Sequence, residues 1–332
     1  MRFRGISVIV PLALALGAPI AAAGQQPARV AQIGVLSSGF PPSSPQYMRS
    51  RFDAFLQGLR ERGYDEGQSV TIHWGFASGQ DDQLPALAAD LVARKVDVIV
   101  TTSTPATLVA QRATGVIPIV MTGLADPLRS GLVKSLARPG GNTTGLSQTT
   151  AEIYGKRLEL LREAVPGLTR VAVLYNPTNR PSVDDWKETD AAARSVRLQV
   201  LPVEARDARE LEAAVSAMIR ERVHGLVVTA DQKYVNERVR LASLALQARL
   251  PTIFWTREFA QAGGLMTYGP NVAHLYRRAA TYVDKILKGA KPSDLPVEQP
   301  TIFELLVNLK TARDLGLAIP QSILIRTDEL IQ

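Results

Sequence analysis

The chain has 332 residues, no cysteine and a formal net charge of +7, from 38 Lys and Arg against 31 Asp and Glu. The absence of cysteine excludes disulfides, thiolate catalysis and cysteine-ligated metal sites. The charges of both signs are interspersed as on solvated helix faces, and no basic run with interleaved aromatic residues occurs, so we expect no nucleic-acid partner.

The first 23 residues have the pattern of a secretory signal peptide. Arg2 and Arg4 precede an apolar run at 6–16, and Ala21-Ala22-Ala23 offers a cleavage site before Gly24. A membrane anchor is the alternative, but the apolar run is short for a span and is followed closely by glycine and proline. We therefore expect a periplasmic mature chain of roughly 300 residues, which is enough for two domains.

From Val30 onward, short apolar runs alternate with amphipathic runs. The predicted strands are Gln32–Leu36, Val70–Trp74, Val96–Val100, Ile117–Met121, Arg170–Tyr175, Gln199–Val203, Gly225–Val228, Thr252–Trp255 and Leu265–Thr267. The predicted helices include Gln46–Arg62, Gln83–Arg94, Glu152–Val165, Val183–Val196 and Ala208–Arg222. Continuous apolar strands that alternate with helices predict parallel sheets covered on both faces, which is the α/β class.

An internal repeat indicates that this pattern occurs twice. Residues 81–103 match residues 208–230 at a constant offset of 127, with apolar residues at equivalent positions. We therefore predict two Rossmann-like lobes with parallel sheets. Lobe 1 covers 29–146 and is completed by about 272–298, and lobe 2 covers 150–266 and is completed by about 301–332.

Three chain crossings between the lobes would form a hinge. They are expected near 146–150, 267–270 and 298–301. Ligands of open α/β sheets bind beyond the carboxyl ends of the strands, and in a two-lobed chain those ends meet across one cleft. The loops that follow the strands are therefore the places to seek function.

The stretch TTSTPAT at 101–107 is the strongest binding candidate. Ser103 or Thr104 can cap a helix that begins with Pro105, and the free N–H groups of the first helical turn favour an anion such as a ligand carboxylate. A helix cap that satisfies itself and binds nothing is the alternative. The equivalent loop of lobe 2 places Asp231 where lobe 1 has Thr104, and its carboxylate could accept hydrogen bonds from a ligand ammonium.

Other strand-end residues extend the predicted site. They comprise a second acceptor for the ammonium, polar groups after the first strand of each lobe, and aromatic rings for the ligand side chain. These residues are Asp126, Ser38, Asn176, Phe40, Trp255 and Tyr268. Ordinary turn capping and core packing are the alternatives for them.

Enzyme signatures are missing from the sequence. His73, His224 and His274 have no metal-site spacing, no GxSxG elbow occurs, and the glycine-rich segment 137–147 lacks the ending of a phosphate-binding loop. We expect no catalytic residue, no metal and no cofactor. A catalytic triad assembled from distant residues stays open.

Three segments carry a family resemblance. Residues 124–147, 263–271 and 282–331 resemble the tryptophan/tyrosine-type substrate-binding proteins of bacterial ABC transporters, within the type I periplasmic binding proteins. The motifs Ala-Arg-Pro-Gly-Gly-Asn and Gly-Gly-Leu-Met-x-Tyr-Gly are specific to that family, although Thr267 stands where a serine is common. The resemblance implies a monomeric, hinge-closing receptor without catalytic activity, which delivers its ligand to an ABC permease in the inner membrane. An aromatic amino acid is implied for some members.

The expected function is that of an exported solute-binding protein of an ABC importer with an amino-acid-like ligand. An exported sensor module that docks on a receptor is one alternative, and the sequence does not separate the two because both need the same cleft. An exported α/β hydrolase is the other alternative, and the missing nucleophile elbow disfavours it.

Overall fold

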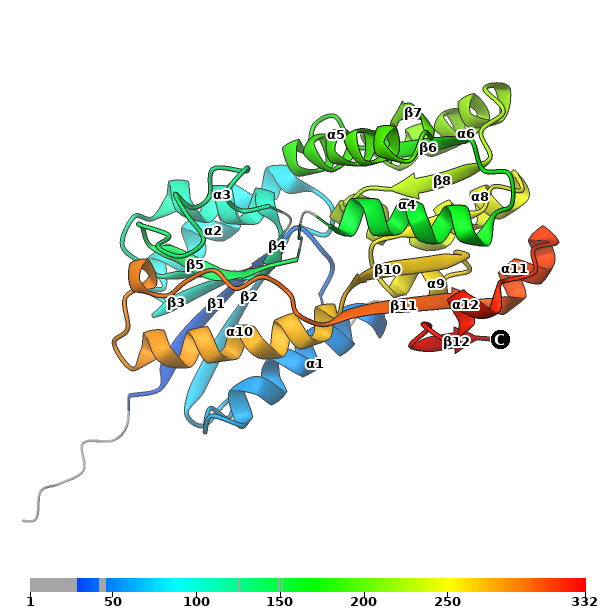
Figure 1. The fold of residues 1–332 in the computed structure, drawn as a ribbon. Helices are drawn as coiled ribbons and strands as arrows, with labels where there is room; N and C mark the ends of the chain where they lie inside the picture. The colour runs from blue at the N-terminus through cyan, green and yellow to red at the C-terminus, as the bar shows by residue number, and fades with distance from the viewer. Residues whose placement is uncertain (1–28, 42–45, 125, 149, 151) are drawn as a thin grey trace, which may run out of the picture.

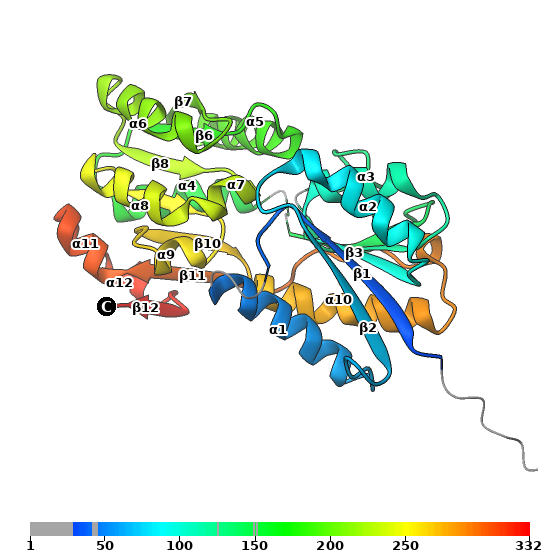
Figure 2. The same ribbon diagram turned by 180° about the vertical axis from the view of Figure 1, so that it is seen from behind.

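The computed structural model describes residues 29–41, 46–124, 126–148, 150 and 152–332. The predicted signal peptide lies outside the described residues. The described chain forms two α/β lobes that lie side by side and are joined by several chain crossings (Figures 1 and 2).

Lobe 1 is built on a five-stranded parallel sheet in the order β2-β1-β3-β4-β5. Its strands are β1 Ala31–Ser37, β2 Val70–Phe76, β3 Val98–Thr101, β4 Ile119–Leu124 and β5 Thr143–Ser147. One face is covered by α2 Leu84–Ala93 and α3 Thr104–Ala113, and the other by α1 Gln46–Arg60 and α10 Val272–Leu287. Figure 1 shows these two helical layers above and below the sheet.

Lobe 2 is built on a seven-stranded sheet in the order β12-β11-β10-β9-β8-β6-β7. Its strands are β6 Arg170–Tyr175, β7 Gln199–Glu204, β8 Gly225–Val228, β9 Thr252–Phe254, β10 Met266–Pro270, β11 Phe303–Asn308 and β12 Glu329–Ile331. Its helices are α4 Ile153–Ala164, α5 Arg180–Ser195, α6 Leu211–Arg220, α7 Gln232–Asn236, α8 Arg238–Gln247, α9 Glu258–Gln261, α11 Leu309–Leu315 and α12 Gln321–Leu324. Short 3-10 turns η1 Asp81–Gln83, η2 Ala208–Glu210 and η3 Pro292–Asp294 complete the described elements.

The central strands are apolar along their whole length because helices cover both faces of each sheet. All residues of β3 and of its lobe-2 counterpart β8 are buried. The predicted strands β6 and β8 have the observed bounds, and the other predicted strands overlap the observed ones with ends shifted by one to three residues.

One expectation about the sheets is corrected. Strand β11 runs antiparallel to β10, so the lobe-2 sheet is mixed. The chain leaves lobe 2 through β10, adds α10 to lobe 1 and returns as β11 from the opposite direction. Apolar periodicity identifies a strand but carries no information on its direction, so this reversal could not be predicted from it.

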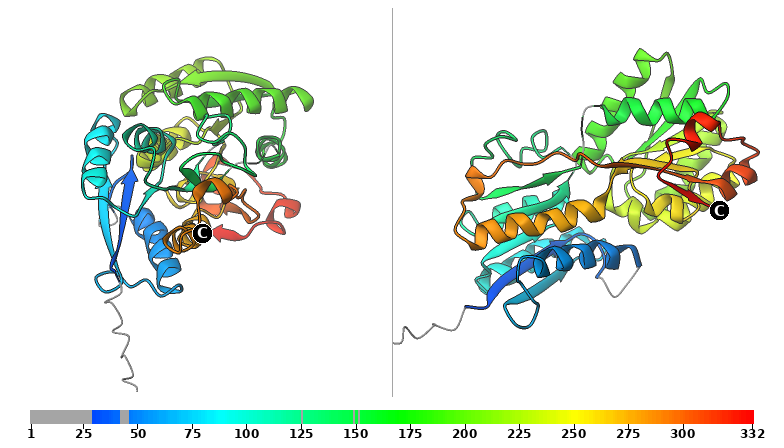
Figure 3. Two further views of the ribbon diagram at one scale, coloured as in Figure 1. Left: turned by 90° about the vertical axis from the view of Figure 1, so that its left-hand side faces the viewer. Right: turned by 60° about the horizontal axis from the view of Figure 1, so that its bottom comes forward.

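The crossing segments are hydrogen-bonded to one another near the cleft. Ser147 N donates to Glu298 O at 2.8 Å, Glu298 N donates to Gly145 O at 3.0 Å, and Asn271 N donates to Ile302 O at 3.1 Å. Figure 3 shows the segment before β11 running along the lobe-1 sheet and into lobe 2. These hydrogen bonds join the connections between the lobes to one another.

Candidate functional site: the cleft between the lobes

A cavity of about 90 Å³ lies between the lobes, at the carboxyl ends of the strands in both sheets. The connectivity explains the position, since parallel strands release their following loops at the same sheet edge. Of the nine predicted ligand-binding residues, six line this cavity: Ser38, Ser103, Thr104, Asn176, Asp231 and Trp255.

The lobe-1 wall is formed by the amino-terminal turn of α3. Ser103 is the N-cap, and its Oγ accepts a hydrogen bond from Ala106 N at 3.3 Å. The same hydroxyl lies 2.8 Å from Ser38 Oγ, which joins the loops after β1 and β3. The first N–H groups of a helix have no partner within the helix and carry the positive end of its dipole. This wall therefore offers hydroxyls and N–H donors to an anionic group.

The capping role of Ser103 can be measured directly. Replacement of an N-cap serine by alanine costs about 1 kcal/mol, so Ser103→Ala should lower the free energy of unfolding in urea by that amount. Ser103→Thr keeps an acceptor at the same position and serves as the matched control. Equal stability of the alanine variant and the wild type would show that the 3.3 Å contact does not stabilise the helix.

The lobe-2 wall centres on Asp231, which is 5% exposed. Its Oδ1 accepts from Lys233 N at 2.7 Å as the N-cap of α7, and its Oδ2 accepts from Asn176 Nδ2 at 2.8 Å and Asn179 Nδ2 at 2.9 Å. Burial raises the pKa of the Asp231 carboxyl, and the three hydrogen bonds oppose that rise. The Asp231 carboxylate therefore already accepts hydrogen bonds from three donors of lobe 2 and fixes their positions in this wall of the cavity.

The two capping residues correct the predicted alignment of the lobes. The offset of 127 pairs Thr104 with Asp231, whereas the structure gives the N-cap role to Ser103 in lobe 1 and to Asp231 in lobe 2. Strand β3 ends two residues before the N-cap of α3, whereas β8 ends three residues before the N-cap of α7. One extra residue in the lobe-2 loop shifts the equivalence, and strand periodicity does not detect a change of this size in a loop.

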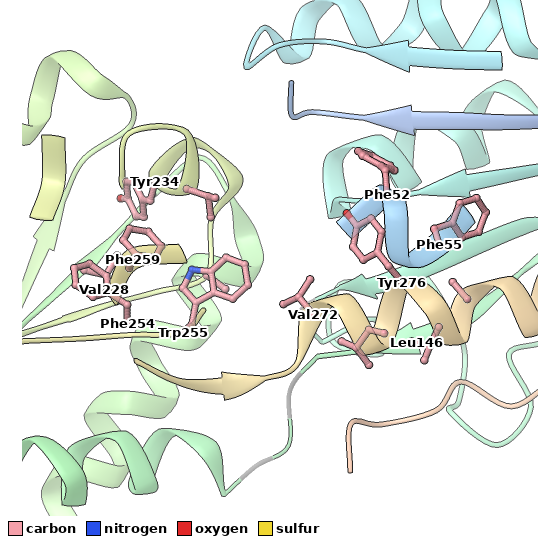
Figure 4. Packing of buried hydrophobic residues seen from close by; sticks show 14 of the residues in the cluster. Phe52, Phe55, Leu146, Val228, Tyr234, Phe254, Trp255, Phe259, Val272 and Tyr276 are labelled. Carbon is pink, nitrogen blue, oxygen red and sulfur yellow. The ribbon is translucent and has the colours of Figure 1, made fainter. Parts of the chain in front are cut away.

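The floor of the cavity is formed by apolar and aromatic residues, and the buried side chain of Arg51 on α1 also lines the cavity. Trp255 follows β9 and is 5% exposed, and Val272 and Tyr276 on α10 also line the cavity. Figure 4 shows Trp255 on the lobe-2 side, facing Val272 and Tyr276 across the junction. Phe52 packs edge-on against Tyr276 with ring centroids 5.5 Å apart. One hydrophobic cluster thus runs from the core of lobe 1 through the cavity floor into lobe 2.

The other three predicted residues do not line this cavity. Asp126 Oδ1 accepts from Leu128 N at 3.0 Å and from Arg129 N at 2.9 Å, which is the turn capping that was its alternative interpretation. The Tyr268 ring stacks on Phe303 with centroids 5.9 Å apart, beside a different surface pocket. Phe40 is half-buried and is not among the lining residues.

Among the described residues, two ion pairs connect the lobes, and neither was predicted from the sequence. Arg51 on α1 and Glu258 on α9 lie 2.7 Å apart, and both side chains are 4% exposed. Burial alone would raise the pKa of Glu258, but the Arg51 guanidinium and the Thr256 hydroxyl reverse this, so that the pKa lies below its usual value. In the second pair, Arg129 lies 2.6 Å from Glu188 on α5, and both side chains are more than a third exposed.

No trio of side chains suited to holding a metal ion occurs among the described residues. Within the same part of the chain, none of the helices combines the length and the apolar character needed to cross a membrane.

The two lobes, the hinge and the cleft define the type I periplasmic binding protein fold. Residues 44–331 match the family described as ABC transporter substrate binding protein, and the chain belongs to that family. A tyrosine-binding protein of Clostridioides difficile (strain R20291) is 27% identical over 263 residues, which are 79% of this chain and 75% of the relative.

Solved structures support the same assignment. The ABC domain from Streptococcus pneumoniae in complex with L-Trp has a TM-score of 0.84 at 28% identity, covering 91% of this chain and 99% of that one. A conserved domain protein from Vibrio cholerae has a TM-score of 0.85 at 26% identity, covering 91% of this chain and 100% of that one.

Proposed function

We propose that this chain is the extracytoplasmic solute-binding protein of an ABC importer and that it binds an aromatic amino acid between its lobes. The observation that carries the proposal is that hydrogen-bonding groups and the aromatic residues Trp255 and Tyr276 line the same cavity. The relatives described as binding tyrosine and L-Trp support this ligand class.

The polar and apolar parts of the cavity suit different parts of such a ligand. Its carboxylate would lie at the start of α3, where Ser103, Thr104 and the helix N–H groups provide donors. Its ring would lie on the floor against Trp255 and Tyr276, where aromatic rings pack with offset or edge-on geometry. Asp231 would keep Asn176 and Asn179 in place on the opposite wall.

Binding would be coupled to closure of the lobes. Groups from both lobes line the cavity, so a bound ligand contacts both only in the closed arrangement and thereby shifts the equilibrium toward it. The exposed pair between Arg129 and Glu188 joins the lobes and would be one of the contacts that closure forms. A permease that contacts both lobes would then distinguish the loaded protein from the empty one.

A thermal-shift screen over the twenty amino acids tests the proposal. At about 100 times Kd, a ligand adds about 2.7 kcal/mol to the free energy of unfolding, which raises Tm by roughly 5 °C in a chain of this size. We expect tyrosine, tryptophan or both to produce such a shift, and aspartate and lysine to produce none. The absence of a shift with every aromatic amino acid would contradict the proposed ligand class.

A further inference from the structure

Asp81 is a cavity-lining carboxylate that the binding scheme above leaves without a role. It begins η1, directly after the loop that follows β2, and it lines the cavity from the side of lobe 1. Its Oδ1 is inaccessible to solvent and has no hydrogen-bond partner among the described residues. A buried polar atom without a partner is uncommon in a native protein, because the lost hydration is not replaced.

The loop that holds Asp81 is fixed to the polar wall of lobe 1. Gly79 N donates to Ser38 O at 2.8 Å, and Ser78 N donates to Gly39 O at 3.0 Å. Gly79 has a φ of +84°, a left-handed conformation that glycine adopts without strain. Since Ser38 is in turn hydrogen-bonded to Ser103, the Asp81 loop and the α3 cap form one connected wall.

The two carboxylates that line the cavity, Asp81 and Asp231, differ in how many of their hydrogen-bond acceptor positions are still free. Asp231 accepts three hydrogen bonds from its own lobe, and an ionised carboxylate has about four acceptor positions. Asp81 Oδ1 accepts none from the described residues. In an α-amino acid the ammonium and the carboxylate are attached to the same carbon atom. A carboxylate bound at the α3 cap therefore places the ammonium close to the same wall, which is the wall that carries Asp81.

We propose that Asp81 is the carboxylate that binds the α-ammonium group of the ligand. This assignment rests on the proposed amino-acid ligand and replaces Asp231 as the ammonium partner. In the closed cleft, the ligand ammonium donates to the Asp81 carboxylate, which lines the cavity, while the helix N–H groups of the α3 cap donate to the ligand carboxylate. The lobe-1 wall then binds both charged groups of the zwitterionic ligand, and lobe 2 closes over the ligand.

The experiment compares two ligands on three proteins by titration calorimetry. The ligands are L-tyrosine and 3-(4-hydroxyphenyl)propanoate, which lacks only the amino group; L-tryptophan and 3-(indol-3-yl)propanoate form a second pair. The proteins are the wild type, Asp81→Asn and Asp82→Asn. Asp82 is the exposed neighbour of Asp81 and is the matched control for the loss of one negative charge.

We expect Asp81→Asn to weaken binding of the amino acid roughly 10- to 100-fold, as for a lost hydrogen bond between charged groups. The same variant should bind the des-amino compound at least as tightly as the wild type does, because no ammonium is then present. Asp82→Asn should match the wild type with both ligands. The unliganded Tm of Asp81→Asn should equal that of the wild type, because Asp81 Oδ1 has no hydrogen bond to lose among the described residues.

Two results would overturn the assignment of Asp81 alone. One is an unchanged affinity of Asp81→Asn for the amino acid, and the other is an equal loss for the amino acid and its des-amino counterpart. The second result would show that Asp81 only organises the wall. If instead the wild type binds neither amino acid, the proposed function itself fails, and the ammonium assignment fails with it.

Discussion

Arg51→Met should lower the free energy of unfolding by about 3–5 kcal/mol, because it leaves the buried carboxylate of Glu258 without its countercharge. Both side chains are 4% exposed, so bulk solvent screens the Glu258 charge only weakly. Urea unfolding at pH 7, monitored by far-UV circular dichroism, measures the change.

Arg129→Met provides the matched control for this prediction. It also removes an arginine from an ion pair that joins the two lobes. In this pair, however, the side chain of Arg129 is 43% exposed and that of Glu188 is 36% exposed. Exposed pairs contribute at most about 1 kcal/mol. An equal effect of the two substitutions would show that burial does not govern the contribution of the Arg51 pair.

The same pair gives a pH dependence whose sign follows from the lowered pKa of Glu258. A carboxyl group with a pKa lower in the folded state than in the unfolded state contributes stability above its unfolded value, which is 4.5 here. That contribution is lost as the pH falls below 4.5 through the folded pKa. We expect the difference in stability between wild type and Arg51→Met to shrink over this acidic range.

Gly269→Ala should destabilise the protein by about 3 kcal/mol or more and weaken ligand binding as well. A Cβ at this position would lie 1.8 Å from the carbonyl oxygen of Trp255 and 2.8 Å from its carbonyl carbon. Both contacts are with backbone, so relief requires β10 to move away from the end of β9. That movement would shift Trp255, which lies on the cavity floor.

Gly155→Ala is the control for the glycine prediction. Gly155 lies in α4, where an added Cβ meets nothing within 4 Å, and alanine favours a helix by about 0.5–1 kcal/mol. We expect this variant to equal or exceed the wild type in stability and to bind ligand normally. Wild-type stability of Gly269→Ala would contradict the packing of β9 against β10 described above.

Features that depend on local chemistry could be predicted from the sequence. A helix cap at Ser103 or Thr104 follows from hydroxyl side chains between an apolar strand and a proline, and the structure gives the cap to Ser103. The turn at Asp126 follows from an aspartate before proline. The bounds of β6 and β8 follow from uninterrupted apolar runs between polar loops. In each case the interacting groups are a few residues apart in the chain.

Features that depend on distant contacts could not be predicted in this way. Arg51 and Glu258 are 207 residues apart, and nothing near either residue identifies its partner. No residue near Asp81 in the sequence marks it as part of a binding site, because its position depends on the loop that is hydrogen-bonded to Ser38 and Gly39. Trp255 lines the cavity, whereas Tyr268 on β10 lies beside a different pocket. Strand periodicity does not predict which side chains of β10 face the cleft.

The central claim is that an aromatic amino acid lies in the cleft between the lobes, and a crystal structure grown with L-tyrosine or L-tryptophan tests it most directly. We predict electron density for the amino acid with its carboxylate at the amino-terminal turn of α3 and its ring against Trp255 and Tyr276. An amino acid bound outside the residues that line this cavity, or a cleft that stays empty at saturating ligand, would contradict the claim.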